Sequence, residues 1–362
     1  MAAISSASPA CWFMISYERQ IVEATVYAAA CRLSSGILPI MLLSFIVLIL
    51  VGLAVVLWWL WPTPLGRFFQ WAERRRSGLR SRSVDHNGIA WHYLEGGRGE
   101  PLVLLHGFNA DADHFCRVAA CLRPHFRILA PDLPGFGDTR FEDLPSFRIE
   151  DVARRVFDWL DALGVQRVYL GGNSMGGYLA VAMARQAPER VRALWLLAPG
   201  GLHTARLSPV FEEVAEERHN PLVVRNASDF RRLMDYCFVR PPWIPGPLLR
   251  FLALRTMRHA VRAQRIFDAM RYDSRPLEDL ARDLATPTLI IWGQADQVLH
   301  PSGADLLAEL MPSTRVLVVE KIGHLPMLEA PKIIAEAWLG FAEAIARDDL
   351  GDPSSPGSAA SR

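Results

Sequence analysis

The sequence predicts an α/β fold in which helices cover both faces of a mostly parallel sheet, with a helical cap inserted into it and an apolar helix before it. From residue 83 to residue 347, short apolar runs alternate with helical patterns, which is typical of parallel strands joined by helices. The alternation breaks once, between Gly201 and Ala285, where strand patterns stop and helical patterns follow one another. The third observation is the uncharged segment from Ile37 to Trp61.

The segment 37–61 predicts a transmembrane helix or a signal-type segment, because it exceeds the roughly 20 apolar residues that cross a bilayer as a helix. It closes with Trp58, Trp59 and Trp61, as expected where indole rings lie at the level of the lipid headgroups. No cleavage site with small residues follows, which favours an uncleaved anchor. A buried core helix of this length would normally keep a polar face.

The flanks of this segment predict its orientation. We expect residues 1–36 to form an N-terminal tail, and Met14 or Met41 is an alternative first residue. Basic residues are more frequent after the anchor than before it: Arg67, Arg74, Arg75, Arg76 and Arg80 follow it, and Arg19 and Arg32 precede it. Because such residues are enriched on the cytoplasmic side, we expect a single-pass protein of a bacterial inner membrane whose large domain faces the cytoplasm.

Two further segments are predicted to lie outside the α/β core. Residues 62–82 read as a basic connector, whose arginines 74–76 either bind anionic headgroups or are solvated. Residues 348–362 are polar and rich in Gly, Ser and Pro, so we expect them to be disordered.

Composition excludes several classes of protein. Of the 362 residues, 51% are hydrophobic and 21% are charged, which argues against a disordered chain. The formal net charge of +1 lacks the basic excess typical of nucleic-acid binders. None of the five cysteines forms a Cys-x-x-Cys pair, so we expect free thiols and no zinc or redox site of that type.

The α/β core is predicted in two segments, 83–201 and 286–347, on either side of the cap 202–285. Runs such as PLVLLHG and TLIIWG are apolar throughout, as in strands buried on both faces. The predicted strands are 89–94, 102–106, 127–130, 168–171, 193–197, 288–292 and 315–319. The predicted helices are 150–163, 176–186, 302–310 and 331–345.

The motif with the clearest chemistry is Gly172-Asn173-Ser174-Met175-Gly176, which follows a predicted strand and precedes a predicted helix. This is the context of a nucleophile elbow, a strained turn that presents a serine hydroxyl above the sheet edge. The glycines keep side chains out of the crowded turn. The helix amino terminus lets the Met175 N–H stabilise an oxyanion. The alternative is a glycine-rich turn with an idle serine.

A serine hydroxyl needs a base, and in this architecture the acid and the base follow the serine in the chain. Asp296 and His324 fit this order, because each lies just past a predicted strand, at the edge where open α/β sheets bind ligands. His324 is expected to take the serine proton and Asp296 to orient His324. Asp132 is a competing carboxylate, but it precedes Ser174 and its Pro and Gly neighbours indicate a turn.

The second oxyanion donor is expected from the Phe108 N–H, in the loop that follows the strand 102–106. His106 is expected to shape this loop through hydrogen bonds. His203 and His300 remain open as substrate contacts near the cleft. The other histidines are expected to be surface or satisfied core residues: His86, His92, His114, His125, His219 and His259.

The predicted cap is unusually apolar for a lid that faces water. Most of its large apolar side chains are expected to form the cap's own core, and the remainder an acyl-binding pocket. They are Phe230, Met234, Tyr236, Phe238, Trp243, Leu248, Leu249, Phe251, Met257, Phe267 and Met270.

With these residues in place, the segment 83–347 resembles the α/β-hydrolase superfamily. It is most similar to the membrane-anchored monoacylglycerol lipases, in the anchor end LWPTPLGRFFQW followed by arginines, the HGF loop, GNSMGG and WGQADQVLHPSGADLLAEL. The resemblance implies an amino-terminal anchor, a cytoplasmic catalytic domain with a helical cap, and hydrolysis of monoacylglycerols. It also implies that Ser174, Asp296 and His324 form the triad and that Phe108 and Met175 donate to the oxyanion.

Two other functions share features with this sequence. Carbon–carbon hydrolases of aromatic ring-cleavage products share GNSMGG, but they usually carry Trp after the catalytic histidine, where Leu325 stands here, and they lack an anchor. A non-catalytic receptor on this fold would be expected to have lost a triad residue. The sequence therefore predicts a serine hydrolase of lipid esters, with the bilayer and a lipid ester as partners, no nucleic acid, and no metal or organic cofactor. It leaves protein partners open.

Overall fold

The computed structural model describes residues 9–60, 62–216 and 220–349, with the backbone alone at 9–16, 32–38, 57–60 and 348–349. The chain divides into two compact units, Met1–Pro62 and Thr63–Arg362, and each is described on its own.

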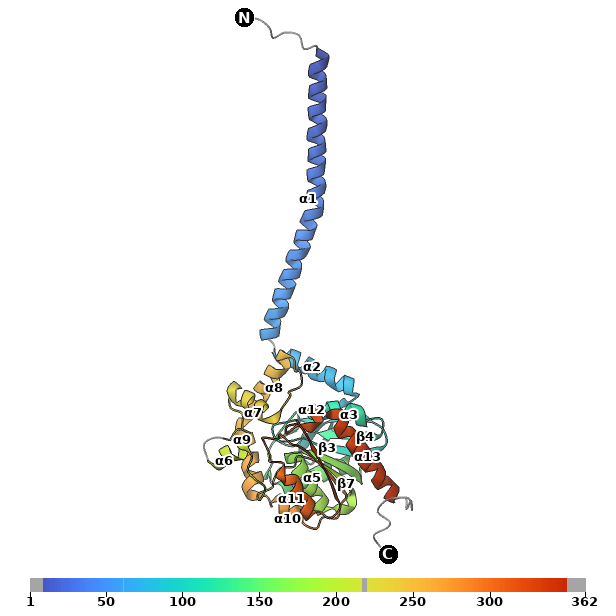
Figure 1. Ribbon diagram of the computed structural model, residues 1–362, viewed down its shortest axis with the longest axis vertical. Coiled ribbons are helices and arrows are strands. Elements are labelled where there is room, and N and C mark those ends of the chain that lie inside the picture. Colours follow the sequence, from blue (N-terminus) through green and yellow to red (C-terminus); the bar gives the residue numbers. More distant parts are fainter. Residues whose placement is uncertain (1–8, 61, 217–219, 350–362) are drawn as a thin grey trace. The chain divides into compact units, whose positions relative to one another are not determined.

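The amino-terminal unit consists of one helix, α1 (Pro9–Leu60) (Figure 1). Its stretch Pro39–Val56 has a mean hydropathy of 2.9 and is nowhere buried, so this part is long and apolar enough to cross a membrane. Residues 9–36 of the expected tail are helical. No Gly or Pro interrupts the chain between Pro9 and Gly36, and alanines favour the helix. Residues 1–8, Trp61 and the side chains of Trp58 and Trp59 lie outside the described ones.

The expected connector 62–82 forms helix α2 (Pro62–Ser77) and the start of strand β1 (Arg80–His86). Pro62 and Pro64 lie in the first turn of α2, where a missing N–H removes no helical hydrogen bond. Gly78, with φ of 72°, ends the helix in the left-handed conformation. A Cβ at Gly66 would lie 2.4 Å from Cβ of Phe251, so α2 packs closely on the cap helix α8 (Gly246–Arg258).

Nine strands of the described residues form one sheet, in the order β1-β2-β4-β3-β6-β7-β8-β9 with β5 paired to β2. The pairs β1/β2, β2/β4 and β2/β5 are antiparallel, and all others are parallel. The remaining bounds are β2 (Ile89–Gly97), β3 (Glu100–Leu105), β4 (Phe126–Pro131), β5 (Arg140–Phe141), β6 (Val168–Asn173), β7 (Val191–Leu197), β8 (Thr288–Gly293) and β9 (Thr314–Val319).

The predicted mostly parallel α/β sheet is confirmed, and each predicted strand corresponds to an observed one. The sequence missed β1 and β5, which are largely exposed and carry mostly polar or charged residues. Both owe their place to antiparallel pairing with β2, which apolar periodicity does not reveal.

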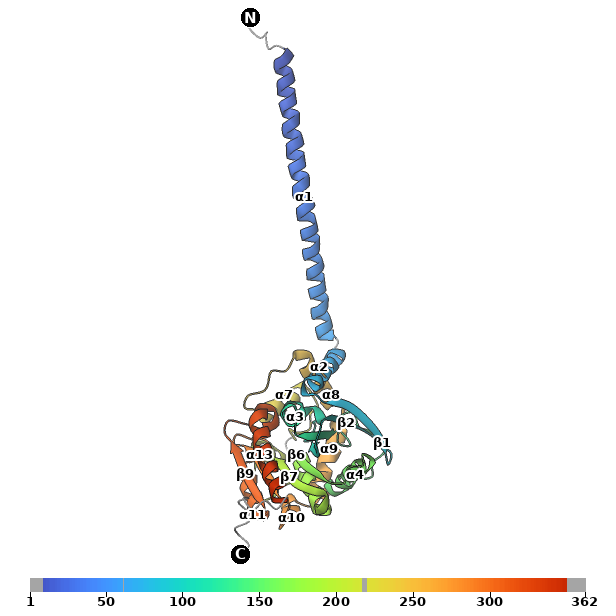
Figure 2. The same cartoon turned by 90° about the vertical axis from the view of Figure 1, so that its right-hand side faces the viewer.

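Each face of the sheet packs on its own set of helices. One core joins the sheet to α4 (Ile149–Ala162), α5 (Met175–Gln186), α10 (Leu277–Ala281) and α11 (Ser302–Leu310). The other joins it to α3 (Cys116–Leu122), α12 (Pro326–Glu329) and α13 (Pro331–Asp349). Figure 2 shows α4 and α13 on opposite sides of β6 and β7.

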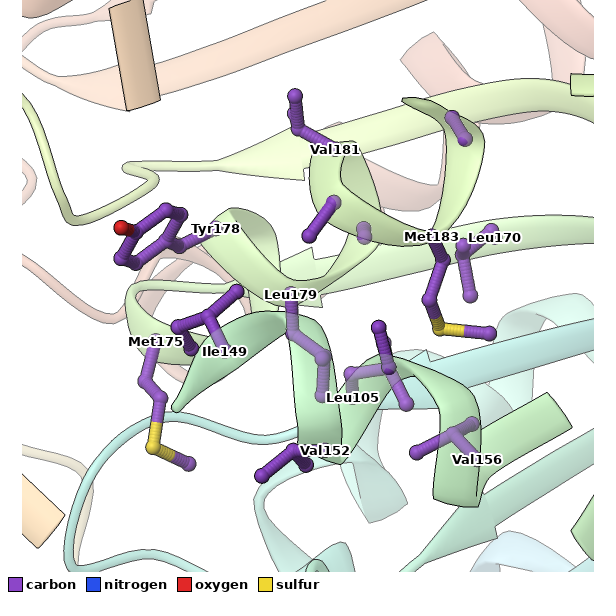
Figure 3. Packing of buried hydrophobic residues seen from close by; sticks show 14 of the residues in the cluster. Leu105, Ile149, Val152, Val156, Leu170, Met175, Tyr178, Leu179, Val181 and Met183 are labelled. Atoms are coloured by element: carbon purple, nitrogen blue, oxygen red, sulfur yellow. The ribbon is translucent and has the colours of Figure 1, made fainter. Parts of the chain in front are cut away.

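The packing around α5 fixes the helix that begins next to Ser174. Its side chains Leu179 and Met183 are fully buried, and they lie among Leu105, Val152 and Val156 from β3 and α4 (Figure 3). Burying a side chain of this size contributes about 2 kcal/mol. The helix start is therefore held rigidly against the sheet.

The cap holds four helices among the described residues, in the segment where successive helical patterns were expected. They are α6 (Pro209–Ala215), α7 (Ala227–Cys237), α8 and α9 (Ala260–Asp268), and α9 continues into a π-helical turn, η3 (Ala269–Asp273). The short helix α10 packs in the core beneath α5. The expected disordered tail is helical as far as Asp349, and residues 350–362 lie outside the described ones.

Candidate active site

Ser174 occupies the turn between β6 and α5. Its backbone angles, φ 55° and ψ −118°, lie in a region that L residues rarely adopt. A Cβ at Gly172 would lie 2.2 Å from the Gly176 carbonyl oxygen, and one at Gly176 would lie 2.0 Å from that of Leu105. Neither position accepts a side chain, which is why the turn requires glycine at both positions, as predicted.

His324 and Asp296 form a buried pair beyond β9 and β8. The Nδ1 atom of His324 lies 2.8 Å from Oδ2 of Asp296, and the two side chains are 5% and 0% exposed. The other Asp296 oxygen accepts hydrogen bonds from the backbone N–H groups of Val298 and Leu299, at 2.8 and 3.0 Å. The carboxylate is thus held in place to accept a hydrogen bond from Nδ1, which leaves Nε2 of His324 as the proton acceptor.

Ser174 and His324 line the same cavity, of about 230 Å³. One contact ties the pair to the elbow and another ties it to the cap: Asn173 donates through Nδ2 to the His324 carbonyl oxygen at 3.2 Å, and His324 N–H donates to the carbonyl oxygen of Cys237, at the end of α7, at 2.9 Å. The structure thus brings together the serine, the histidine and the carboxylate that the sequence predicted.

The two expected oxyanion donors flank Ser174. Met175 is the first residue of α5, where an N–H has no partner within the helix. Phe108 lies in the loop after β3 and lines the serine cavity. A Cβ at the adjacent Gly107 would lie 3.3 Å from Cβ of Ser174, so this loop passes directly over the nucleophile.

His106 shapes that loop, as expected. Its Nδ1 lies 2.8 Å from the Gly107 carbonyl oxygen, and the Leu133 N–H donates to its Nε2 at 2.8 Å. These bonds fix a neutral tautomer, and burial lowers the pKa of His106, which favours the same form.

The competing carboxylate, Asp132, holds a turn. It accepts hydrogen bonds from the Ala112 and Asp138 N–H groups, at 2.9 and 2.7 Å, and lies 2.7 Å from Nδ1 of His92. In the described part of the chain none of its hydrogen bonds reaches His324. Asp132 also belongs to the one potential metal-ligand group among the described residues. This group is His92, Asp132 and Asp138, whose ligand atoms lie within 4.8 Å of one another. Their bonds to each other and to the turn account for this cluster.

The serine cavity combines apolar and polar lining. Cap residues from α7 onward supply much of the apolar lining, and residues from α2 and the 3₁₀ turn η1 (Ala112–Phe115) with its neighbours supply a polar group that we call the polar end. The apolar set includes the predicted Phe230, Met234, Phe238 and Leu248, together with Leu233 and Leu252. The polar end is Gln70, Glu73, Asp111, Asp113, His114 and Arg117, and the cap adds the polar residues Arg255, Thr256 and His259.

Most charges at the polar end are paired. Asp113 accepts hydrogen bonds from Gln70 at 2.8 Å and from Arg74 at 2.6 and 2.8 Å. Asp111 pairs with Arg255 at 2.8 Å. Burial and the nearby Asp111 charge raise the pKa of Asp113 to about 6, despite the opposing effect of Arg74. The sequence had suggested that Arg74 either binds a headgroup or is solvated. In the structure it does neither, because it pairs with Asp113.

His114 is a lining residue of the serine cavity that the sequence did not predict. It was expected to be structural, yet it lines the serine cavity, and its Nδ1 is buried without a hydrogen-bond partner. Burial lowers the pKa of His114, so the ring is neutral and keeps one free acceptor or donor atom. His259 also lines this cavity. No sequence motif predicted that His114 or His259 would line this cavity, because tertiary packing places them there.

Other predicted residues lie elsewhere. His203 and His300 line a second cavity that contains neither Ser174 nor His324, so their expected place at the cleft is wrong. Phe267 and Met270 line that second cavity too, and Trp243 is 81% exposed. His92 is a satisfied partner of Asp132, as expected, and His219 lies outside the described residues.

The fold and the site define a carboxylic ester hydrolase with the α/β-hydrolase fold, and comparisons with known proteins agree. The family model described as "alpha/beta hydrolase fold" matches residues 100–233. Lipase 1 of Psychrobacter immobilis is 32% identical over 74% of this chain and 86% of its own length. Monoacylglycerol lipase ABHD6 of Mus musculus is 28% identical over 88% of this chain and 96% of its own.

A solved structure points the same way. The crystal structure of a membrane phospholipase A, described as a bacterial virulence factor, shares 36% identity and a TM-score of 0.77, and it covers 84% of this chain and 98% of its own. The chain belongs to the α/β-hydrolase family, and within it to the enzymes that hydrolyse lipid esters.

Proposed function

We propose that this enzyme is a membrane-anchored monoacylglycerol hydrolase that acts through an acyl-enzyme on Ser174. The observation that carries the proposal is the lining of the serine cavity, in which apolar side chains from the cap accompany the polar residues around η1. A monoacylglycerol combines the same two characters, with one long acyl chain and a small alcohol that bears hydroxyl groups.

The reaction follows from the positions of the groups. His324 Nε2 takes the proton as Ser174 Oγ attacks the ester carbonyl, and Asp296 stabilises the imidazolium that forms. The Phe108 and Met175 N–H groups stabilise the oxyanion, and removal of one such donor costs about 3 kcal/mol in comparable sites. The alcohol leaves with the proton from His324, and water then releases the fatty acid from Ser174.

His114 supports the glycerol assignment. A buried polar atom without a partner costs about 1–3 kcal/mol, and a hydroxyl group of a bound alcohol would satisfy Nδ1 of His114. The carboxylates beside it are already engaged by Gln70, Arg74 and Arg255. The name of the monoacylglycerol lipase relative agrees with this choice of substrate.

The test compares two esters of the same acyl chain, 1-monododecanoylglycerol and methyl dodecanoate, on the wild type and on His114→Met. We expect kcat/KM of the variant to fall about tenfold on the glycerol ester, the equivalent of one lost hydrogen bond, and to change less than twofold on the methyl ester, which has no hydroxyl.

The matched control is His125→Met, which alters an exposed histidine that lines neither the serine cavity nor the second cavity and should leave kcat/KM on both esters unchanged. A wild type that turns over only the methyl ester would overturn the monoacylglycerol assignment. Equal losses on both esters in His114→Met would overturn the role of His114.

We further propose that α1 anchors the enzyme and that the catalytic domain faces the cytoplasm. The support is the apolar stretch Pro39–Val56 and the arginine excess after it. Alkaline phosphatase fused after Arg347, which needs the periplasm to fold, should be inactive, and a fluorescent-protein fusion at the same position should be bright. The reverse pattern would contradict this orientation.

A further inference from the structure

A second cavity, of about 470 Å³, lies between the segment that follows β7 and the cap elements α6 and η3. Its size is within the range of small-molecule sites, roughly 300–1,000 Å³. Neither Ser174 nor His324 lines it. It adjoins the serine cavity through two aromatic rings, because Phe267 lines the second cavity and its centroid lies 6.1 Å from that of Phe108.

The lining combines apolar surface with positive charge. Phe211, Phe267 and Met270 supply the apolar surface, and Arg206 and Arg271 supply the charge. No aspartate or glutamate occurs among the described residues that line it. The chemistry is that of a site for an elongated apolar molecule with an anionic end.

Arg271 is the main reason to expect an anion. Its guanidinium carbon lies 5.7 Å from the ring centroids of both Phe211 and Tyr272, which hold it at the cavity wall. Its Nε is buried and has no hydrogen-bond partner, and no carboxylate pairs with it in the parts of the chain described, 9–60, 62–216 and 220–349. A charged donor left unpaired in a partly dry site is costly, and a bound carboxylate would remove that cost.

The Glu278 carboxylate holds the segment after β7 through one of its oxygens. Oε1 accepts hydrogen bonds from the backbone N–H groups of His203 and Thr204, at 2.6 and 2.8 Å, and from the Thr204 hydroxyl at 2.9 Å, whereas Oε2 is buried without a partner. It does not line the cavity. Its role is to order the segment after β7 that forms one wall.

We propose that the second cavity binds a fatty-acid anion, with the carboxylate at Arg271 and Arg206 and the alkyl chain along Phe211, Phe267 and Met270. A lipid ester hydrolase releases this class of molecule in each turnover, and the shared aromatic wall places the cavity next to the site of release. The inference does not depend on which lipid ester is the substrate.

The test is photo-crosslinking with a diazirine analogue of dodecanoic acid. The full-length protein in lipid nanodiscs is first treated with a long-chain alkyl fluorophosphonate, which occupies the serine cavity. After irradiation, mass spectrometry of peptides locates the adducts. We expect adducts on the peptides that carry Phe211 or Met270, suppressed by excess dodecanoate and not by dodecanol.

Replacement of the cation provides the decisive comparison. Arg271→Met should lower labelling of these peptides at least fivefold, and the exposed Arg275→Met, which lies outside the cavity, should leave it unchanged. Arg206→Met, at an exposed position, serves as a second variant if Arg271→Met fails to fold, and it should also weaken labelling.

Three results would overturn the proposal: adducts that map only to the serine cavity, equal competition by dodecanol, or full labelling in both arginine variants. The fluorophosphonate reaction is read out separately as a mass increase on Ser174. Failure of the catalytic serine is therefore distinguishable from failure of the second site.

Discussion

At the scale of single residues, the site residues that the sequence predicted are those whose positions are determined by the local backbone. Ser174, Asp296 and His324 each follow a strand, and the glycines around Ser174 are required by carbonyl oxygens only 2.0 to 2.2 Å from where their Cβ atoms would be. His114 was not predictable, because it reaches the cavity through the packing of η1 rather than through a motif. The spacing of residues in the sequence predicts local turns, but it does not predict which distant side chains meet in a cavity.

Asp296→Asn tests the role of the buried carboxylate. The amide can accept the Val298 and Leu299 hydrogen bonds, but its NH₂ group would then face His324 and select the wrong tautomer. We expect kcat to fall about 10⁴-fold with KM nearly unchanged, as for the equivalent change in serine proteases. Steady-state kinetics on a monoacylglycerol measures this, and a loss of less than tenfold would contradict the assignment of Asp296.

At the scale of secondary-structure elements, α2 was misread because its arginines suggested a solvated connector. In the structure one face of α2 packs on the catalytic domain, where Arg74 and Asp113 are each 15% exposed and 2.6 Å apart. The opposite face carries Arg76, which is 83% exposed. Charge alone did not distinguish these two faces.

Arg74→Met should destabilise the catalytic domain, because it leaves the Asp113 carboxylate nearly buried without its charged partner. Breaking such a pair costs about 3 kcal/mol. Arg76→Met should change the free energy of unfolding by less than about 0.5 kcal/mol. Urea unfolding followed by tryptophan fluorescence compares the two, and equal stabilities would show that α2 contributes little.

The turn around Asp132 makes a pH-dependent contribution to stability. Burial would raise the pKa of Asp132, but the hydrogen bond and charge of His92 outweigh it and lower that pKa to about 2. Burial would lower the pKa of His92, but Asp132 outweighs it and raises that pKa. The Asp132 contribution is present above about pH 4 and is lost as the pH falls toward 2, whereas the His92 contribution is present below about pH 6.5 and is lost as the pH rises through the raised pKa.

We therefore expect the difference in Tm between the wild type and His92→Gln to be largest between about pH 4 and 6.5, and to narrow toward pH 9 and toward pH 2. Thermal unfolding across this range measures it. A difference that stays constant with pH would mean that the pair contributes only as a neutral hydrogen bond.

At the scale of the whole molecule, the sheet and its two layers of helices were predictable because buried parallel strands are apolar throughout. The edge strands β1 and β5 were not, since pairing with β2 rather than apolar character defines them. The existence of the cap was predictable from the break in alternation. Its division into a serine cavity and a second cavity was not, because this depends on how α6 to η3 pack on the core.

The central claim is that Ser174 is the nucleophile that hydrolyses a lipid ester in the serine cavity beneath the cap. The most direct measurement is the release of glycerol and fatty acid from 1-monododecanoylglycerol by the full-length enzyme and by Ser174→Ala. We expect equal amounts of the two products from the wild type. We expect the rate of release to fall at least 10³-fold in the variant, since the residual rate after loss of a triad member is small. Undiminished release by Ser174→Ala would contradict it.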